Sequence, residues 1–187
     1  MRVKLSALML CASVFFFGCK ASNDCLDKAV TFRDKLLDSN GCKFQSEVTA
    51  DYGEKVFKFS MDCTADKNGN VTFEVTEPAS ISGICGKIDT QGGAITFDDQ
   101  ILAFQSLTDG EITPVNAPWL LIKTLRGGYV RSCTDTDDGF EVSIDDSYEE
   151  NALHLIISFE HDIPDECEIF WKSRRILTVE IEEFAIL

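Results

Sequence analysis

The residues with the most chemical potential in this chain are eight cysteines and two histidines. Two of the cysteines, Cys11 and Cys19, lie in an N-terminal segment that is typical of an export signal and is described below. The other six are Cys25, Cys42, Cys63, Cys85, Cys133 and Cys167. An even number of cysteines in an exported chain is typical of disulfide bonding. The sequence contains no Cys-x-x-Cys pair, and no histidine stands at zinc-ligand spacing from a cysteine pair. This pattern disfavours both redox catalysis and structural zinc.

Other catalytic and metal-binding motifs are also missing from the sequence. There is no Gly-x-Ser-x-Gly nucleophile elbow and no phosphate loop ending in Gly-Lys-Ser/Thr. His154 and His161 each have the sequence context of a surface histidine. Asp66 and Glu77 have the spacing of calcium ligands, but Val71 stands where an EF-hand loop needs glycine, which favours a hairpin turn. We therefore predict no catalytic residue, no metal and no cofactor, and expect that the protein is not an enzyme.

The N-terminus is typical of a secretory signal. Arg2 and Lys4 form a basic segment, and residues 5–17 form an apolar run that is too short to cross a bilayer as a helix. We predict that residues 1–19 are a signal peptide and that residues 20–187 form one domain, because about 168 residues suit a single hydrophobic core.

The end of this segment resembles the lipobox of bacterial lipoproteins, in which a cysteine becomes acylated and forms the mature N-terminus. Gly18 before Cys19 fits the pattern, whereas Phe16 and Phe17 depart from it. The resemblance implies lipidation of Cys19 with fatty chains such as palmitate, which would anchor the protein outside the bacterial cell membrane. The alternative is ordinary secretion with cleavage near Ala21.

Charge excludes one class of partner. Without the signal, 15 basic side chains face 32 acidic ones, which gives a net charge of −17. Nucleic-acid-binding proteins concentrate lysine and arginine instead, so a nucleic-acid partner is excluded. An anionic lipid surface would also repel the chain, and membrane attachment therefore depends on the lipid at Cys19. We expect a monomer.

Periodicity predicts two helices within an otherwise all-strand chain. In residues 25–39, Ala29, Phe32, Leu36 and Leu37 recur at helical spacing, and Asn40-Gly41 is a favoured helix end. A second helix is predicted at 114–126. Alternating apolar residues predict strands at 44–50, 57–61, 71–75, 81–88, 95–97, 101–104, 129–133, 140–144, 153–159, 167–171 and 176–184.

The first hairpin yields a disulfide hypothesis. If Tyr52 and Gly53 are its two central turn residues, Cys42 lies opposite Cys63 in a non-hydrogen-bonded pair. Cα atoms in such a pair lie about 4.5 Å apart, which a disulfide accepts. The alternative is a shifted register, with Cys42 bonded to Cys25. The remaining four cysteines allow three connectivities.

The order of elements predicts the fold class. Strands joined by short turns pair antiparallel, and one face of the resulting sheet must be covered. The two helices are the only available cover. We therefore predict an α+β fold in which a strongly curved antiparallel sheet, an open half-barrel, carries two helices on its concave face.

The closing segment carries a family resemblance. Ile163-Pro164 is followed by the strand ECEIFW at 166–171, the turn KSRR at 172–175, and the strand ILTVEIEEF at 176–184. This arrangement, and Pro78 before a strand, resemble the lipoprotein-carrier and outer-membrane lipoprotein-sorting superfamily. The resemblance implies an open half-barrel with a helical lid, and an apolar cavity that binds acyl chains or lipidated partners. The cysteines and the anchor depart from the soluble periplasmic carrier.

The resemblance leads to a functional hypothesis with two rivals. We predict a lipid-anchored, non-enzymatic envelope protein that binds a lipid or acylated ligand. The first rival is a protein-interaction or envelope-sensing module with no open cavity, and the second is an enzyme of unrecognised type. Aromatic residues that could line a cavity, or could form plain core instead, are Phe57, Phe59, Phe73, Trp119 and Phe159.

Overall fold

The computed structural model describes residues 24–89, 92–97, 100–101 and 113–187, with the backbone alone for 92–97 and 100–101. The predicted signal peptide, the acylation of Cys19 and part of the predicted strand at 101–104 lie outside these residues. Within them no helix is both long and apolar enough to cross a membrane.

All the strands of the described chain form one antiparallel sheet of eleven strands in the order β6-β5-β4-β3-β2-β1-β11-β10-β9-β8-β7. The strands are β1 (Gly41–Asp51), β2 (Val56–Asp66), β3 (Val71–Glu77), β4 (Cys85–Asp89), β5 (Gly92–Phe97), β6 (Gln100–Ile101), β7 (Tyr129–Asp135), β8 (Gly139–Asp145), β9 (His154–Glu160), β10 (Ile163–Trp171) and β11 (Arg174–Ile186). Strands β1 to β6 precede the second helix in the sequence and form one meander, and β7 to β11 follow it and form another. The pairing of β1 with β11 joins the two meanders into one sheet.

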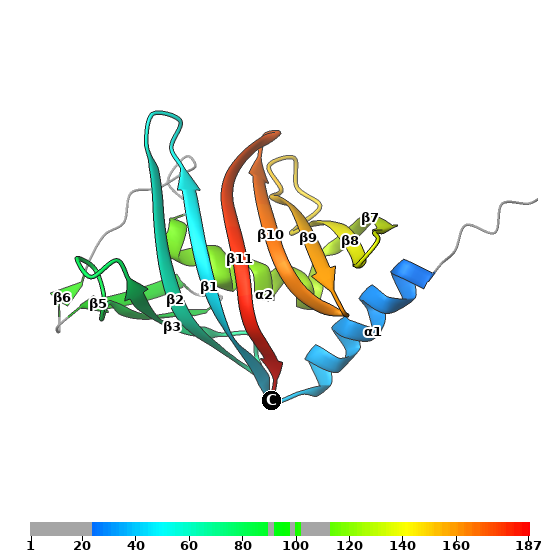
Figure 1. Ribbon diagram of the computed structural model, residues 1–187, viewed down its shortest axis with the longest axis horizontal. Coiled ribbons are helices and arrows are strands. Elements are labelled where there is room, and N and C mark those ends of the chain that lie inside the picture. The colour runs from blue at the N-terminus through cyan, green and yellow to red at the C-terminus, as the bar shows by residue number, and fades with distance from the viewer. Residues whose placement is uncertain (1–23, 90–91, 98–99, 102–112) are drawn as a thin grey trace, which may run out of the picture.

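Two helices cover one face of the curved sheet (Figure 1). Helix α1 (Asp24–Asp38) contacts β1, β7 and β8, and α2 (Ala117–Gly127), preceded by the short η1 (Pro114–Asn116), contacts β2, β3 and β11. Figure 1 shows α2 passing behind the central strands, with α1 at the lower right. The predicted fold class, an open half-barrel with two helices, is confirmed.

Glycine is required where α1 leads into β1. Gly41 has a φ of +133°, and a Cβ added there would lie 2.0 Å from the carbonyl oxygen of Ala65 on β2. Any other residue would push β1 away from β2. The predicted helix end at Asn40-Gly41 therefore reflects a close backbone approach as well as a favoured turn.

The predicted register of the first hairpin is wrong by two residues. Asp51 pairs with Val56, so four residues form the loop, and Cys42 pairs with Ala65 while Phe44 pairs with Cys63. The loop is held by its own side chain, because Asp51 Oδ1 accepts a 2.6 Å hydrogen bond from the Gly53 N–H. Arg174 at the start of β11 donates to the Asp51 carbonyl at 2.9 Å. This contact across 123 residues is invisible to a local turn rule.

The core lies between the helices and the sheet. On β1, alternate residues are buried, namely Cys42, Phe44, Ser46, Val48 and Ala50, and the same alternation continues on β2, β3 and β8–β11. Helix α2 buries Leu120, Leu121, Ile122 and Leu125 completely or nearly so. Each such side chain contributes about 1.5–3 kcal/mol by leaving water, so α2 is an integral part of the core.

Candidate functional site

The candidate site is an aromatic cluster beneath α1. Phe32 of α1 packs edge-on against Phe159 of β9, with ring centroids 5.0 Å apart, and also contacts Phe184 of β11 at 5.8 Å. Phe159 stacks on Phe140 of β8 at 4.4 Å, and Phe184 stacks on Phe44 of β1 at 5.6 Å. Phe32 is therefore the point at which α1 closes over aromatic side chains contributed by four strands.

A small apolar hollow adjoins this cluster, between α1, the end of α2 and strands β7 to β9. Its lining consists of Ala29, Val30, Phe32, Arg33, Leu125, Val130, Val142, Ile144 and Phe159. The hollow encloses about 20 Å³. That volume holds about one water molecule, whereas pockets for lipid-sized ligands measure about 300–1,000 Å³. In this conformation the helix-covered side is closed and filled by side chains.

Two arginines hold the helices together reciprocally. Arg33 of α1 donates from Nε to the Leu125 carbonyl at 2.7 Å and from Nη2 to the Thr124 carbonyl at 3.4 Å, both in the last turn of α2. Arg126 of α2 donates to the Leu36 carbonyl at 3.3 Å, in the last turn of α1. Each guanidinium thus satisfies carbonyls at the negative end of the other helix. Burial lowers the pKa of Arg33, and the nearby carboxylate of Asp34 partly offsets this effect.

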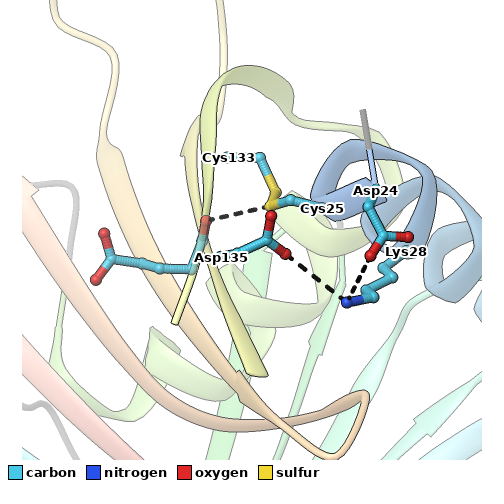
Figure 2. Close-up of a disulfide and its surroundings, with 6 residues drawn as sticks. Asp24, Cys25, Lys28, Cys133 and Asp135 are labelled. Carbon is cyan, nitrogen blue, oxygen red and sulfur yellow. Dashed lines mark hydrogen bonds and ion pairs between the residues drawn. A yellow bond between two sulfur atoms is a disulfide. The ribbon is translucent and has the colours of Figure 1, made fainter. Parts of the chain in front are cut away.

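A disulfide fastens the first turn of α1 to the edge strand β7. Cys25 and Cys133 are bonded, and beside this bond Lys28 reaches the carboxylates of Asp24 at 3.2 Å and Asp135 at 3.7 Å (Figure 2). The Lys28 ammonium and both carboxylates are partly exposed, so these ion pairs add little stability. The covalent bond is the strong attachment, and the remainder of α1 is held by packing and by the arginines.

The predicted Cys42–Cys63 disulfide is not formed. Both are free thiols in the structure, together with Cys85 and Cys167. In the observed register Cys42 and Cys63 are diagonal neighbours on one face, and diagonal neighbours lie about 7–8 Å apart, farther than the Cα atoms of a disulfide. Burial raises the pKa of each thiol to about 12, so neither is a nucleophile at neutral pH.

The five aromatic residues predicted to line a cavity do not come together at one site. Phe59, Phe73 and Phe159 are buried, and of the five only Phe159 lines the apolar hollow. Trp119 on α2 is half-buried under the Lys123 ammonium, 5.3 Å from its ring. Phe57 lies near the tip of the β1–β2 hairpin and is 50% exposed. Sequence reasoning missed Arg33 and Arg126. Arg126 stands in the last turn of α2, but Arg33 lies in the middle of α1 and carries no sequence signal of its role.

A larger hollow of about 700 Å³ lies over β1 to β4. Most of its lining comes from exposed positions that alternate with the buried ones, namely Lys43, Gln45, Asp62, Thr64, Thr72, Glu74, Cys85 and Lys87. The buried residues Phe44, Cys63 and Phe73 also line it. Carboxylates, ammonium groups and hydroxyls of this kind suit water better than an acyl chain, so this hollow is not the lipid site.

His154 belongs to a polar network on the exposed side of β8 and β9. His154 Nδ1 lies 2.8 Å from Asp145 Oδ1, and Nε2 lies 3.3 Å from Ser143 Oγ. Arg131 forms an ion pair with the other oxygen of Asp145 at 3.0 Å. The order of groups resembles a catalytic triad. Ser143, however, lies within a strand that is paired on both sides, so the neighbouring N–H groups belong to the sheet and leave no oxyanion hole. Among the described residues no group of three or more histidine, cysteine and acidic side chains could hold a metal ion.

Comparison with known proteins finds similar structures but no matching sequence. No family model and no curated protein matches the chain. A LolA superfamily protein from Nitrosomonas europaea is 10% identical over 85% of this chain and 93% of that chain, with a TM-score of 0.46. A putative outer-membrane lipoprotein-sorting protein domain from Vibrio parahaemolyticus is 5% identical over 86% and 91%, with a TM-score of 0.43. The Mycobacterium tuberculosis lipoprotein LppX is 10% identical over 88% and 96%, with a TM-score of 0.40. The superfamily that the sequence resembles is thus among the similar structures.

Proposed function

We propose that this protein is a non-enzymatic envelope lipoprotein, anchored through Cys19, that binds a lipid or acylated ligand beneath α1. The main observation in support is the way in which α1 covers the apolar hollow. The helix closes this hollow, yet only Cys25, Phe32 and Leu36 of its fifteen residues are buried. The ligand site is the aromatic cluster with the adjoining hollow, enlarged when α1 moves away.

The attachments of α1 suit such a movement. The first turn of α1 is bonded covalently to β7 through Cys25, and its last turn continues through Ser39 and Asn40 into β1. Between these two attachments α1 is held to α2 by the hydrogen bonds of Arg33 and Arg126. Water can replace hydrogen bonds to carbonyls when the helices separate, so they are weaker obstacles than buried apolar contacts. Helix α2, with four large side chains in the core, stays with the sheet. Opening therefore means that the middle of α1 moves away from the sheet while both of its ends stay attached.

A specific observation favours the rival function, a protein-interaction module. The covered face is filled, and the β1–β2 hairpin presents Val56 and Phe57 at 63% and 50% exposure. Tyr52 packs edge-on against Phe57, with centroids 5.5 Å apart. Exposed apolar side chains of this kind mark contact surfaces for partners. Under this alternative Phe57→Ser abolishes partner binding and leaves acyl binding unchanged.

Native mass spectrometry of the mature protein, followed by titration with a fluorescent fatty acid, tests the proposal. We expect a co-purifying lipid and saturable binding of the probe. Ala29→Trp, which fills the hollow from the α1 side, should weaken binding about tenfold or more. Thr31→Trp, on the exposed side of α1, is the matched control and should bind like the wild type. The proposal fails if no lipid is retained and Ala29→Trp binds the probe as well as Thr31→Trp.

A further inference from the structure

Helix α1 carries a second, partly exposed apolar surface beside the side that it packs against the sheet. Leu26, Val30 and Leu37 are 41%, 47% and 44% exposed. Residues four and eleven apart on an α-helix fall within about 40° of one another, so the three form a single stripe along the helix. The buried residues Phe32 and Leu36 lie on an adjacent side. The stripe is therefore an addition to the core face, and nothing in the described part of the chain covers it.

We propose that this stripe lies on the lipid bilayer that carries the anchor, so that α1 rests along the membrane surface. The inference depends on the proposed function at one point, the lipid at Cys19. The inference adds that the bilayer contacts the stripe and that the bilayer supplies the lipid ligand. A helix with an apolar side and a charged side is the form that interfacial helices take.

The short connection between anchor and helix places α1 at the membrane. Only four residues separate Cys19 from Asp24. Five Cα-to-Cα steps span at most about 17 Å even when fully extended. The first turn of α1, with Leu26, is thereby held near the headgroups whatever its orientation. Because α1 itself is about 22 Å long, Leu37 reaches the surface only if the helix lies parallel to it.

The stripe also adjoins the mouth of the apolar hollow. Val30 belongs both to the stripe and to the lining of the hollow, and Ala29 and Arg33, which flank the stripe, line the hollow as well. A helix that lies on the bilayer along Val30 therefore brings this mouth against the acyl chains. A lipid could then pass beneath α1 without crossing water.

The charges beside the stripe specify the kind of bilayer. Asp27, Asp34 and Asp38 project along the other exposed flank of α1, within about 120° of Leu26 around the helix. An anionic surface would repel them, as it would the chain as a whole. The preferred surface is a zwitterionic one, and the apolar contact rather than charge supplies the attraction. The tether raises the effective concentration of the stripe at the surface.

Tryptophan quenching by brominated lipids tests the orientation of α1. Lipidated mature protein carrying Val30→Trp is incorporated into phosphatidylcholine vesicles with brominated acyl chains, and its emission is compared with that of the wild type, which contains Trp119 and Trp171. We expect the added emission to be quenched about twofold or more, and less strongly when anionic lipid is included. Lys35→Trp, on the opposite side of α1, should remain unquenched. Leu37→Trp provides a second reporter if Val30→Trp disturbs folding.

Co-sedimentation with the vesicles tests the lipid anchor at Cys19 separately from the contact between the stripe and the bilayer. If the protein pellets with the vesicles but the emission of Val30→Trp and Leu37→Trp is not quenched, the anchor is present and only the inference about the stripe is overturned. Failure to pellet overturns the anchor and the inference together. A blue shift of Val30→Trp that grows with protein concentration without vesicles would show that a second copy covers the stripe, which also overturns the inference.

Discussion

Replacement of Arg33 by methionine should free α1 while leaving the sheet intact. Methionine retains much of the apolar stem but removes the 2.7 Å bond to the Leu125 carbonyl and the 3.4 Å bond to the Thr124 carbonyl. A hydrogen bond from a charged group contributes about 1.5–3 kcal/mol. Since Arg33 is half-buried and its second bond is long, we expect a loss of about 1–2 kcal/mol.

This loss converts into a change in the opening equilibrium of α1. A difference of about 1–2 kcal/mol corresponds to roughly a 5- to 30-fold larger population of the open form. Amide hydrogen exchange measured by mass spectrometry reports the population of the open form separately for each segment of the chain. We expect protection of Asp24–Asp38 to fall by that factor, and protection of β1, β10 and β11 to stay unchanged. Uptake of a fluorescent fatty acid should accelerate in parallel.

Lys35→Met is the matched control, because it removes a basic side chain of α1 that is exposed on the side away from α2. Its exchange and uptake should equal those of the wild type. The reasoning is refuted if Arg33→Met exchanges like the control. It is also refuted if exchange rises equally in helix and sheet, because α1 would then be part of one cooperative unit.

Three further changes probe other parts of the structure. Cys25→Ser should lower the free energy of unfolding by about 3–5 kcal/mol in denaturant titrations, because its bond to Cys133 closes a loop of 108 residues. Burial, followed by the charges of Glu168 and Glu180, raises the pKa of Glu166, so its ionised form is disfavoured in the folded state. Folding is therefore favoured as pH falls through that pKa, and Glu166→Gln should stabilise the protein at neutral pH but not below about pH 4. Fluorophosphonate probes should leave Ser143 unmodified, because it has no oxyanion hole.

Each of these three changes has its own control. Cys85→Ser removes an exposed free thiol and should leave the free energy of unfolding unchanged. Glu149→Gln, in an exposed loop, should show no pH-dependent gain, and a gain equal to that of Glu166→Gln would contradict the burial argument. An adduct on Ser143 that disappears in His154→Ala would reveal a working triad and end the non-enzymatic proposal.

Local periodicity was sufficient to predict the fold class and most of the elements. The strand predicted at 81–88 is wrong in its first half, because residues 78–83 form a turn and the strand begins at Cys85. The helix predicted at 25–39 is observed at Asp24–Asp38, because Ala29, Phe32 and Leu36 recur at helical spacing and Gly41 permits the turn into β1. Short turns between alternating strands predict antiparallel neighbours, and two helices are the only cover for one face. These predictions depend on contacts close in sequence, which is why they succeed.

Long-range contacts account for what local patterns could not predict. The register of β1 with β2 depends on a four-residue loop that Arg174 braces from the far end of the chain. The pairing of Cys25 with Cys133 depends on α1 lying against β7, a contact that no spacing encodes. The reciprocal arginines likewise depend on where two helix ends meet. In each case the determining partner lies about 90 or more residues away.

Leu37 shows where the rule that apolar positions of a helix face the core breaks down. The sequence prediction grouped it with Phe32 and Leu36, yet it lies about 140° from Phe32 around the helix and is 44% exposed. With Leu26 and Val30 it widens the apolar part of α1 beyond what the sheet can cover. A helix that only covers the sheet needs apolar residues along one side, and Leu26, Val30 and Leu37 extend the apolar part of α1 beyond that side. The surplus indicates a second apolar environment for α1, and the bilayer that would hold the Cys19 lipid lies within reach of its first turn.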